Sequence, residues 1–455
     1  MTPSRSVNVS ELVDHQKLGG FHLRLVLWSF LIMVTDGFDI GLMAFVAPSL
    51  AKVWHIENRA AFAPLFSASF VGILIGSPLF GYIGDRFGRK VAIITGALWY
   101  GVFTLAGLFA TSLETLIVLR FLAGFGIGGV LPNAIALNAE FAPKRFRATM
   151  VILMFTGVTL GGGLPGPIAA LLVPTYGWHI LFIVGGLIPI VVGLCLIVAL
   201  PESLKFLALR RADNAAAVRV ARRLGPQAEI ASDATLTFDE EHKAAISARE
   251  LFAHGLQWVT PLLWLLFVIN LMTFYFLNQW IPLVFADAGL SIKDSALAVT
   301  VFQVGGTIGG LVLARPLDRY GFVPVAILFA LACPVVASIG FLAHDEGALM
   351  TAVFLAGFCL LGLQFGLNAS AGLIYPTGVR AFGVGWALGI GRFGSIIGPM
   401  VGGALVGAHL PMARLYLYAA IPLIVGTLGA VTLVRLYAHV QRTHGAEPQL
   451  RTTTA

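Results

Sequence analysis

The chain has 455 residues, of which 58% are hydrophobic and only 11% are charged, and its mean hydropathy is +0.89. This composition excludes a soluble globular domain and predicts a protein that crosses a membrane many times. The net charge of +7 lies largely in polar segments between apolar runs. We therefore interpret it as a sign of membrane topology and contact with anionic lipid headgroups, not of nucleic-acid binding.

Twelve apolar stretches are long enough to span a bilayer. In chain order they begin near residues 22, 61, 91, 113, 147, 177, 257, 295, 322, 348, 379 and 411. The first twenty residues are polar, and the apolar run after them is too long for the core of a cleaved signal peptide. The sequence therefore predicts an all-α membrane protein with twelve transmembrane helices.

The distribution of Lys and Arg predicts the orientation of these helices. With a cytoplasmic N-terminus, the cytoplasmic segments hold 23 of the 29 basic residues, and the outer loops hold four. The remaining two, Arg120 and Arg392, fall inside spans. The positive-inside rule expects this asymmetry, so we expect both termini in the cytoplasm.

Two sequence matches at one offset indicate an internal repeat. The first pairs Asp85-Arg86-Phe87-Gly88, after the second span, with Asp318-Arg319-Tyr320-Gly321, after the eighth. The second pairs Pro143 and Arg147 with Pro376 and Arg380. Both offsets are 233 residues, which predicts two pseudo-symmetric six-helix bundles related by an axis along the membrane normal.

The expected domains follow from this repeat. They are a cytoplasmic N-terminal tail (1–21), an N-terminal six-helix bundle (22–200), a cytoplasmic linker (201–255), a C-terminal six-helix bundle (256–437) and a cytoplasmic C-terminal tail (438–455). The linker is the longest polar segment, and we expect it to contain some amphipathic helix but no catalytic domain.

Two aspartates lie inside the first span. Asp36 comes twelve residues after Arg24, which at 1.5 Å per helical residue places it roughly 18 Å deep, near the middle of a hydrocarbon core about 30 Å thick. Asp39, three residues later, shares the same helix face. Carboxylates at this depth are costly, and they persist mainly where they face a water-filled cavity or carry protons or substrate.

The two arginines inside spans are candidate partners for a carboxylate. Arg120 lies in the fourth span, about 9 Å below the outer surface, and Arg392 lies in the eleventh, about 18 Å from Arg380. A guanidinium can bind a carboxylate through two hydrogen bonds. For Arg120 that carboxylate is either a substrate's or that of Asp36 or Asp39, and a fixed structural ion pair is the alternative.

These four charges balance formally, which fits the cost of leaving charge unpaired in hydrocarbon. An anionic substrate would add a negative charge, and a proton on one aspartate would make the charges equal again. The arrangement therefore favours proton–anion symport. Arg392 is the better candidate for the substrate carboxylate because its depth matches that of Asp36.

Several motifs resemble those of a known family. The segment 81–90 (GYIGDRFGRK) is similar to the loop 2–3 signature of the major facilitator superfamily, and Pro201-Glu202-Ser203 resembles a further marker of it. Asp36-Gly37-Phe38-Asp39 resembles the first-span signature of the aromatic acid:H⁺ symporter family, which includes 4-hydroxybenzoate/protocatechuate and benzoate transporters. The run from Tyr375 to Pro399 is similar to the same family.

The resemblance covers essentially the whole chain and implies a transporter of the major facilitator fold. It implies that Asp36 and Asp39 are the proton-linked acids and that Arg392, with Arg120, holds a substrate carboxylate. Glu140, at the end of the fourth span, is a further proton-coupling or gating candidate. Its alternative role is to pair with Arg147 or Arg89 in a charge cluster at the inner face.

The loop motifs are expected to latch the inward gate. The second copy is degenerate, because Phe322-Val323 stands where the first copy has Arg89-Lys90, so the latch should be asymmetric. The predicted gating residues are Asp85, Arg86, Gly88, Arg89, Asp318 and Arg319.

Aromatic and amide side chains complete the predicted cavity. Phe38, Tyr275 and Trp386 are candidates to stack on a substrate ring, and Gln279 and Gln303 are candidates to hydrogen-bond it. The alternative is that such residues pack the core or join helices. The other amides considered are Asn270, Asn278, Gln364 and Asn368.

The sequence and the resemblance together predict a proton-coupled importer of an aromatic carboxylate in the bacterial inner membrane. The alternatives are an importer of a non-aromatic acid such as muconate, and a drug/proton efflux antiporter, because the fifth span carries an antiporter-like glycine-proline pattern from Gly157 to Pro167. The expected partners are the substrate, protons and the lipid bilayer, with the chain a monomer. We expect no cofactor, no metal and no enzymatic activity.

Overall fold

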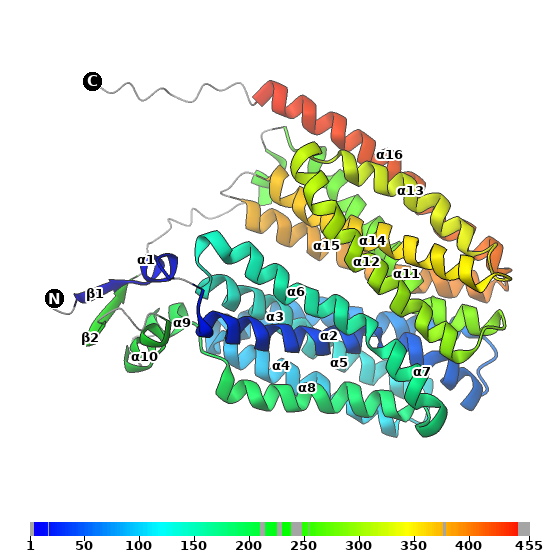
Figure 1. Ribbon diagram of the computed structural model, residues 1–455, viewed down its shortest axis with the longest axis horizontal. Helices are drawn as coiled ribbons and strands as arrows, with labels where there is room; N and C mark the ends of the chain where they lie inside the picture. The colour runs from blue at the N-terminus through cyan, green and yellow to red at the C-terminus, as the bar shows by residue number, and fades with distance from the viewer. Residues whose placement is uncertain are drawn as a thin grey trace. The chain divides into compact units, whose positions relative to one another are not determined.

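The computed structural model describes residues 4–16, 18–209, 214–224, 230–237, 248–253, 255–375 and 379–444. The chain divides into two compact units, which comprise residues 1–55 with 64–242 and residues 56–63 with 243–455. Each consists mainly of long helices that run side by side (Figure 1).

The long helices of the first unit are α2 (Gly20–Val53), α3 (Phe62–Phe87), α4 (Arg89–Ala106), α5 (Leu113–Phe141), α6 (Arg147–Gly163), α7 (Pro165–Tyr176) and α8 (His179–Ala199). Those of the second unit are α11 (Val259–Asp287), α12 (Ile292–Tyr320), α13 (Val323–Ile339), α14 (Glu346–Ile374), α15 (Arg380–Gly407) and α16 (Met412–His444). Short 3₁₀ helices occur at Arg59–Ala61, Gly107–Phe109, Lys144–Phe146 and Ala248–Phe252.

Among the described residues, eleven helical segments are long and apolar enough to cross a membrane. The helix α13 is shorter, with 17 residues, but its length of about 25 Å still lies at the lower limit for a span. It stands at the ninth predicted stretch, so the predicted twelve-helix membrane fold is confirmed.

The fifth predicted span consists of two helices. The helix α6 ends at Gly163, and α7 begins at Pro165, the first residue of its own helix. Proline is favoured at this position because its missing N–H would have no partner in the first turn. The Gly157–Pro167 segment thus interrupts the helix within one continuous span, Thr149–Tyr176, in which Leu164 keeps helical backbone angles.

Some of the described residues outside the long helices form a small group of elements that includes a pair of strands. The strands β1 (Ser4–Asn8) and β2 (Ile230–Thr237) pair in parallel, with Ser4 opposite Ile230. They lie near the short helices α1 (Val9–Asp14), α9 (Leu204–Leu209) and α10 (Asn214–Leu224) (Figure 1). The helix α10 is amphipathic, as predicted for the linker. The strand pair was not predicted.

The internal repeat is visible in how glycines bring helix backbones together. In the first unit, a Cβ atom on any of three glycines of α3 and α5 would collide with a backbone carbonyl of the other helix: Gly72 with Phe121, Gly76 with Phe125, and Gly124 with Ser69. Each of these six residues has a counterpart exactly one repeat, 233 positions, later. The counterparts make the same contacts between α12 and α14: Gly305 with Phe354, Gly309 with Phe358, and Gly357 with Phe302.

Candidate functional site

A buried ion pair joins α2 and α5 in the first unit. The Arg120 guanidinium forms two hydrogen bonds with the Asp39 carboxylate, of which the Nη1–Oδ1 bond is 3.0 Å. The two side chains are 1% and 0% exposed. This bidentate geometry is the strongest that an arginine and a carboxylate can form. Among the carboxylates left open for Arg120, the structure therefore selects that of Asp39.

The remaining donors of Arg120 are also used. Its Nη1 donates to the Thr104 hydroxyl (3.2 Å), Nη2 to the Asp39 backbone carbonyl (3.1 Å) and Nε to the Ser69 hydroxyl (3.2 Å). The Thr104 hydroxyl in turn donates to the Asp39 carboxylate. Because a guanidinium has five N–H donors, these contacts engage all of them, and Arg120 would need to leave Asp39 before it could bind a substrate carboxylate.

Asp36 lies one turn before Asp39 on α2 and is 3% exposed. The Tyr100 hydroxyl, on α4, lies 2.6 Å from the Thr35 hydroxyl. Tyr100 also interacts with the Asp36 side chain and electrostatically with Asp39. The structure therefore places the two predicted proton-linked acids and the predicted Arg120 in one buried polar cluster.

Three members of this cluster, Ser69, Tyr100 and Thr104, were not predicted from the sequence. Their signal was weak, because isolated hydroxyl residues are common in transmembrane helices and often bond only to their own backbone. The four-residue spacing of Tyr100 and Thr104 places them on one helix face, and this was the one cue available.

Phe38 lies between the two aspartates in sequence but packs into the core of the first unit. A Cβ atom on Gly185 of α8 would lie 3.1 Å from the Phe38 ring. The ring therefore faces α8, and its predicted stacking on a substrate remains a prediction.

In the second unit, Arg392 on α15 and Tyr275 on α11 interact electrostatically. The Tyr275 ring also packs edge-on against Phe274, with 4.8 Å between ring centroids. Two of the predicted substrate-binding side chains are thus brought together by the packing of α11 against α15.

Amide side chains form a second polar group in this unit. The Asn270 amide donates to Gln364 Oε1 (3.0 Å), and the Gln364 amide donates to Asn368 Oδ1 (3.2 Å). This chain links α11 to α14, which agrees with the alternative role of joining helices.

Some other buried amides have oxygen atoms that could still accept a hydrogen bond. Within the described part of the chain, Asn278 Oδ1 on α11 and Gln303 Oε1 on α12 are buried and have no donor. Gln279, beside Asn278, is also buried. A buried acceptor without a donor costs free energy, so these oxygens are candidates to accept a hydrogen bond from a group other than the described residues.

Trp386 lies closer to the start of α15 than Arg392. It stacks on Trp264 of α11 with 6.0 Å between centroids and contacts Phe382, and 43% of its surface is exposed. Six residues separate it from Arg392 along the helix, a rise of about 9 Å. Its predicted stacking on the substrate remains a prediction.

Glu140 connects the end of α5 to α9. Its carboxylate accepts hydrogen bonds from the Ser203 hydroxyl and the Lys205 backbone N–H, both 2.7 Å. Ser203 also accepts from the Phe206 N–H, so the two side chains together cap the start of α9. These contacts take the place of the pairing with Arg147 or Arg89 that the sequence suggested.

The Glu202 carboxylate packs against Gly88 of the predicted gate motif after α3. Arg89 pairs with Asp85 (3.2 Å), and Arg86 donates to the Tyr82 hydroxyl (2.7 Å). Gly88 has a φ of +107°, and its Cβ would collide with the Glu202 carboxylate. That carboxylate accepts the Lys90 and Ser203 N–H groups. Burial raises the pKa of Glu202, although these hydrogen bonds oppose the shift.

In the second copy of the motif, the glycine that corresponds to Gly88 is Gly321. Gly321 also has a positive φ, of +59°, but no atom of the described residues beyond its own chain neighbours lies within 4 Å of its Cβ position. The Arg319 guanidinium lies 5.3 Å from the Tyr320 ring centroid. Asp318 lies in α12, and its side chain is outside the described part of the structure. Pro376, used for the repeat, is outside it as well.

The sequence profile of the Major Facilitator Superfamily matches residues 29–337 and 263–454. Three relatives are a gallate transporter of Pseudomonas putida (37% identity, 91% of this chain and 92% of the relative), the 4-hydroxybenzoate transporter PcaK of the same organism (36%, 94% and 96%), and a benzoate transport protein of Acinetobacter baylyi (32%, 93% and 92%).

Solved structures of transporters have a similar fold. The D-xylose-proton symporter superposes with a TM-score of 0.69 at 15% identity, over 92% of this chain and 97% of the symporter. A bacterial homologue of the lysosomal transporter Spinster gives 0.67 at 16% identity, over 94% and 98%. The chain therefore belongs to the Major Facilitator Superfamily, and within it to the family that contains the three relatives above.

Proposed function

We propose that the protein imports a hydroxylated aromatic carboxylate together with a proton, by alternating access of its two units. The observation that carries the substrate class is the similarity, at 32–37% identity over more than nine tenths of the chain, to transporters named for gallate, 4-hydroxybenzoate and benzoate. All three named compounds are benzene rings that carry a carboxylate.

In this proposal Arg392 binds the substrate carboxylate. The support is a comparison of the two intramembrane arginines. Arg120 has every donor engaged by Asp39, Thr104 and Ser69, whereas Arg392 interacts electrostatically with the Tyr275 hydroxyl. Arg120 therefore acts mainly through Asp39, and binds substrate only if that pair opens.

The ring of the substrate lies against the second-unit aromatic and amide side chains. Asn278 and Gln303 present buried oxygens that lack a donor within the described residues, and a phenolic hydroxyl is a donor. Tyr275 offers a ring for stacking. Gln279, Trp386 and Phe38 are further predicted lining residues.

The proton is carried by the Asp36–Asp39 pair, and we favour Asp36 as the carrier. Both carboxylate oxygens of Asp39 are engaged by Arg120, whereas Asp36 interacts with the hydroxyl of Tyr100. A proton on Asp36 would offset the negative charge that the substrate brings. Glu140 is a less favoured carrier because its two oxygens cap α9.

The gate and the topology complete the proposal. Asp85, Arg86, Gly88 and Arg89, with Asp318 and Arg319 in the second half, form the inward gate. The chain acts as a monomer in the bacterial cytoplasmic membrane, with both termini in the cytoplasm, and the bundles 22–200 and 256–437 are its moving parts.

The test is uptake of radiolabelled gallate, 4-hydroxybenzoate, benzoate and muconate into proteoliposomes, with and without an imposed inward proton gradient. We expect gradient-dependent accumulation of at least one hydroxylated ring acid, and weaker accumulation of benzoate. Accumulation of muconate alone would overturn the aromatic pocket. Gradient-independent equilibration of a ring acid would overturn proton coupling, and proton-driven expulsion would establish the antiporter.

A further inference from the structure

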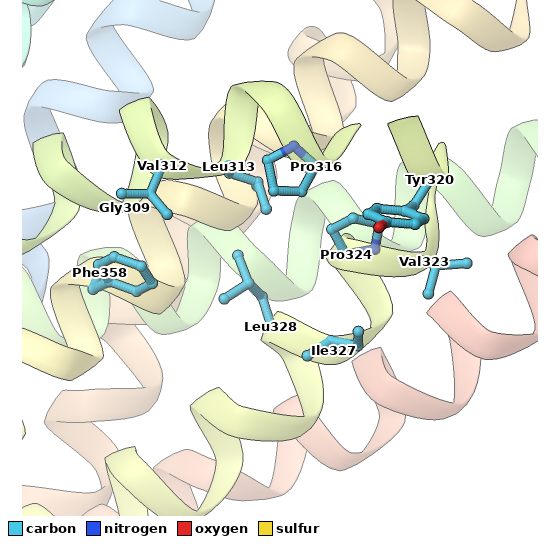
Figure 2. A pocket seen from close by; sticks show the side chains of 10 residues that line it. All are labelled: Gly309, Val312, Leu313, Pro316, Tyr320, Val323, Pro324, Ile327, Leu328 and Phe358. Atoms are coloured by element: carbon cyan, nitrogen blue, oxygen red, sulfur yellow. The ribbon is translucent and has the colours of Figure 1, made fainter. Parts of the chain in front are cut away.

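An apolar groove lies in the second unit, on α12, α13 and α14. Its volume is about 480 Å³, and the side chains around it are hydrophobic. Figure 2 shows them around one hollow, with Phe358 at one end and Tyr320 and Val323 at the other. The lining residues are Gly309, Val312, Leu313, Pro316, Tyr320, Val323, Pro324, Ile327, Leu328 and Phe358.

One end of the groove lies at the degenerate second copy of the loop motif. The helix α12 turns into α13 at Gly321, and Val323 stands where the first copy has Lys90. In the first unit the Lys90 ammonium reaches the Ile197 carbonyl, and Glu202 covers Gly88. In the second unit the Cβ position of Gly321 has no neighbour within 4 Å in the part of the chain that the structure describes, apart from the adjacent residues, and Val323 lines the groove.

The groove has the length of one membrane leaflet. Its α12 lining runs from Gly309 to Tyr320, a rise of about 16 Å, and half of a hydrocarbon core about 30 Å thick is about 15 Å. Tyr320 is the last residue of α12. The groove therefore runs from the membrane surface toward the bilayer centre, in the leaflet that contains the end of α12.

Positive charge lies at the surface end of the groove. Arg315 and Arg319 are exposed residues of the last two turns of α12. Arg319 lies three residues after the lining residue Pro316, on the same helix face, and its guanidinium is held over the Tyr320 ring at 5.3 Å. Guanidinium groups bind phosphates, and basic residues at a membrane surface attract anionic lipids.

We propose that this groove binds an acyl chain of an anionic phospholipid whose phosphate headgroup lies on Arg315 and Arg319. The apolar walls give the chain a fitted surface, and the two guanidinium groups give the selectivity for negative charge. This site is independent of the transported substrate. It requires only that α12 spans the membrane.

The test uses the full chain in nanodiscs that contain a phosphatidylglycerol with a photoreactive diazirine in one acyl chain. We expect labelling of peptides from α12, α13 and α14. The double variant Val323→Trp/Ile327→Trp fills the groove and should abolish most of this labelling. Leu171→Trp, at an exposed apolar position of α7, is the matched control and should leave it unchanged.

The headgroup is tested by comparing the same probe with phosphatidylcholine and phosphatidylglycerol headgroups. We expect groove labelling to favour phosphatidylglycerol, and Arg315→Gln or Arg319→Gln to reduce that preference by about fivefold each, as expected for one basic residue at an anionic surface. Equal labelling of all exposed helices, or groove labelling that survives the two tryptophans in a folded protein, would overturn the site. Equal labelling by both headgroups would overturn the role of the arginines.

Discussion

In the first unit α3 and α5 cross where Gly72 and Gly76 lie against the carbonyls of Phe121 and Phe125, and in the second unit α12 and α14 cross at the residues 233 positions later. The polar residues do not follow this rule. Asp39 and Arg120 correspond to Met272 and Val353, and Arg392 corresponds to Thr159. The two halves therefore share backbone packing but differ in chemistry.

The difference has a physical basis. A glycine at a helix crossing is required by the shape of the bundle, since any side chain there would separate the helices. A buried charge is required only by function, because an apolar residue of similar size costs less in a membrane. The repeat thus retains what the fold needs, and each half carries its own polar groups.

The largest expected effect is that of removing the cation from the first unit. Arg120→Gln leaves Asp39 as a buried carboxylate without its cation, so we expect a loss of stability of about 3–5 kcal/mol and no transport. Thermal unfolding of the purified protein and uptake into proteoliposomes measure both effects. The double variant Asp39→Asn/Arg120→Gln removes both charges and should recover much of the stability. If the losses of stability in this double-mutant cycle are additive, Asp39 and Arg120 do not interact.

The next variant separates the two aspartates. Asp36→Asn cannot carry a proton, so we expect loss of proton-driven accumulation, while exchange of labelled for unlabelled substrate continues. Asp345→Asn is the matched control, because Asp345 caps α14 with a side-chain oxygen that asparagine also provides. If Asp36→Asn accumulates substrate like the parent, Asp36 is not the proton carrier.

A third variant tests the second unit. Arg392→Lys keeps the charge but loses the planar pair of donors, so we expect KM for the aromatic acid to rise about tenfold to a hundredfold, as for the loss of a charged hydrogen bond of about 1.5–3 kcal/mol. The melting temperature should change little. Arg414→Lys, in the first turn of α16, is the control. An unchanged KM would show that a residue other than Arg392 binds the substrate carboxylate.

The two loop motifs can be compared directly with alanine. Gly88 and Gly321 both have positive φ, so either substitution costs about 1–2 kcal/mol of backbone strain. Gly88→Ala should cost about 1 kcal/mol more, because its methyl group would displace Glu202 from the Lys90 N–H. Urea or thermal unfolding measures the difference. Equal losses of stability from the two substitutions would show that the contact between Gly88 and Glu202 does not stabilise the first motif.

The smallest effect concerns pH. Burial raises the pKa of Glu202, so the folded protein binds this proton more tightly than the unfolded chain. The stability from this proton is fully present below the ordinary pKa of 4.5 and is lost as pH rises through the higher folded pKa. The melting temperature of the parent should therefore rise relative to that of Glu202→Gln on acidification from about pH 8 to about pH 4.5. A constant difference would contradict the raised pKa.

Much of the fold was predictable because it depends on local composition. The twelve apolar stretches, the linker helix and the offset of 233 residues were visible in the sequence, and helices longer than a bilayer is thick have few alternatives in lipid. The break between Gly163 and Pro165 was only partly predictable. A glycine-proline segment indicates a weak point, but whether it bends or divides the helix depends on its neighbours.

The site was predictable as a set of residues but not as a set of contacts. The depth of Asp36, Asp39, Arg120 and Arg392 indicated that they belong to polar regions. The partner of Arg120 remained open because Asp39 is 81 residues away, and only the packing of α2 against α5 decides between two aspartates three residues apart. Ser69 and Thr104 were missed for the same reason.

By itself, the sequence determined that this chain spans a membrane with twelve helices, that its halves repeat, and that its first span carries acids that hydrocarbon would not tolerate without partners. These conclusions rest on composition, period and spacing, which are properties of single segments. Only the tertiary structure decided that Arg120 pairs with Asp39, that Glu140 caps α9, and that Glu202 packs over Gly88 of one loop motif while Gly321 of its repeat has no such neighbour among the described residues. Each of those outcomes is a contact between helices far apart in the chain, and the geometry of such contacts is set by how whole helices pack.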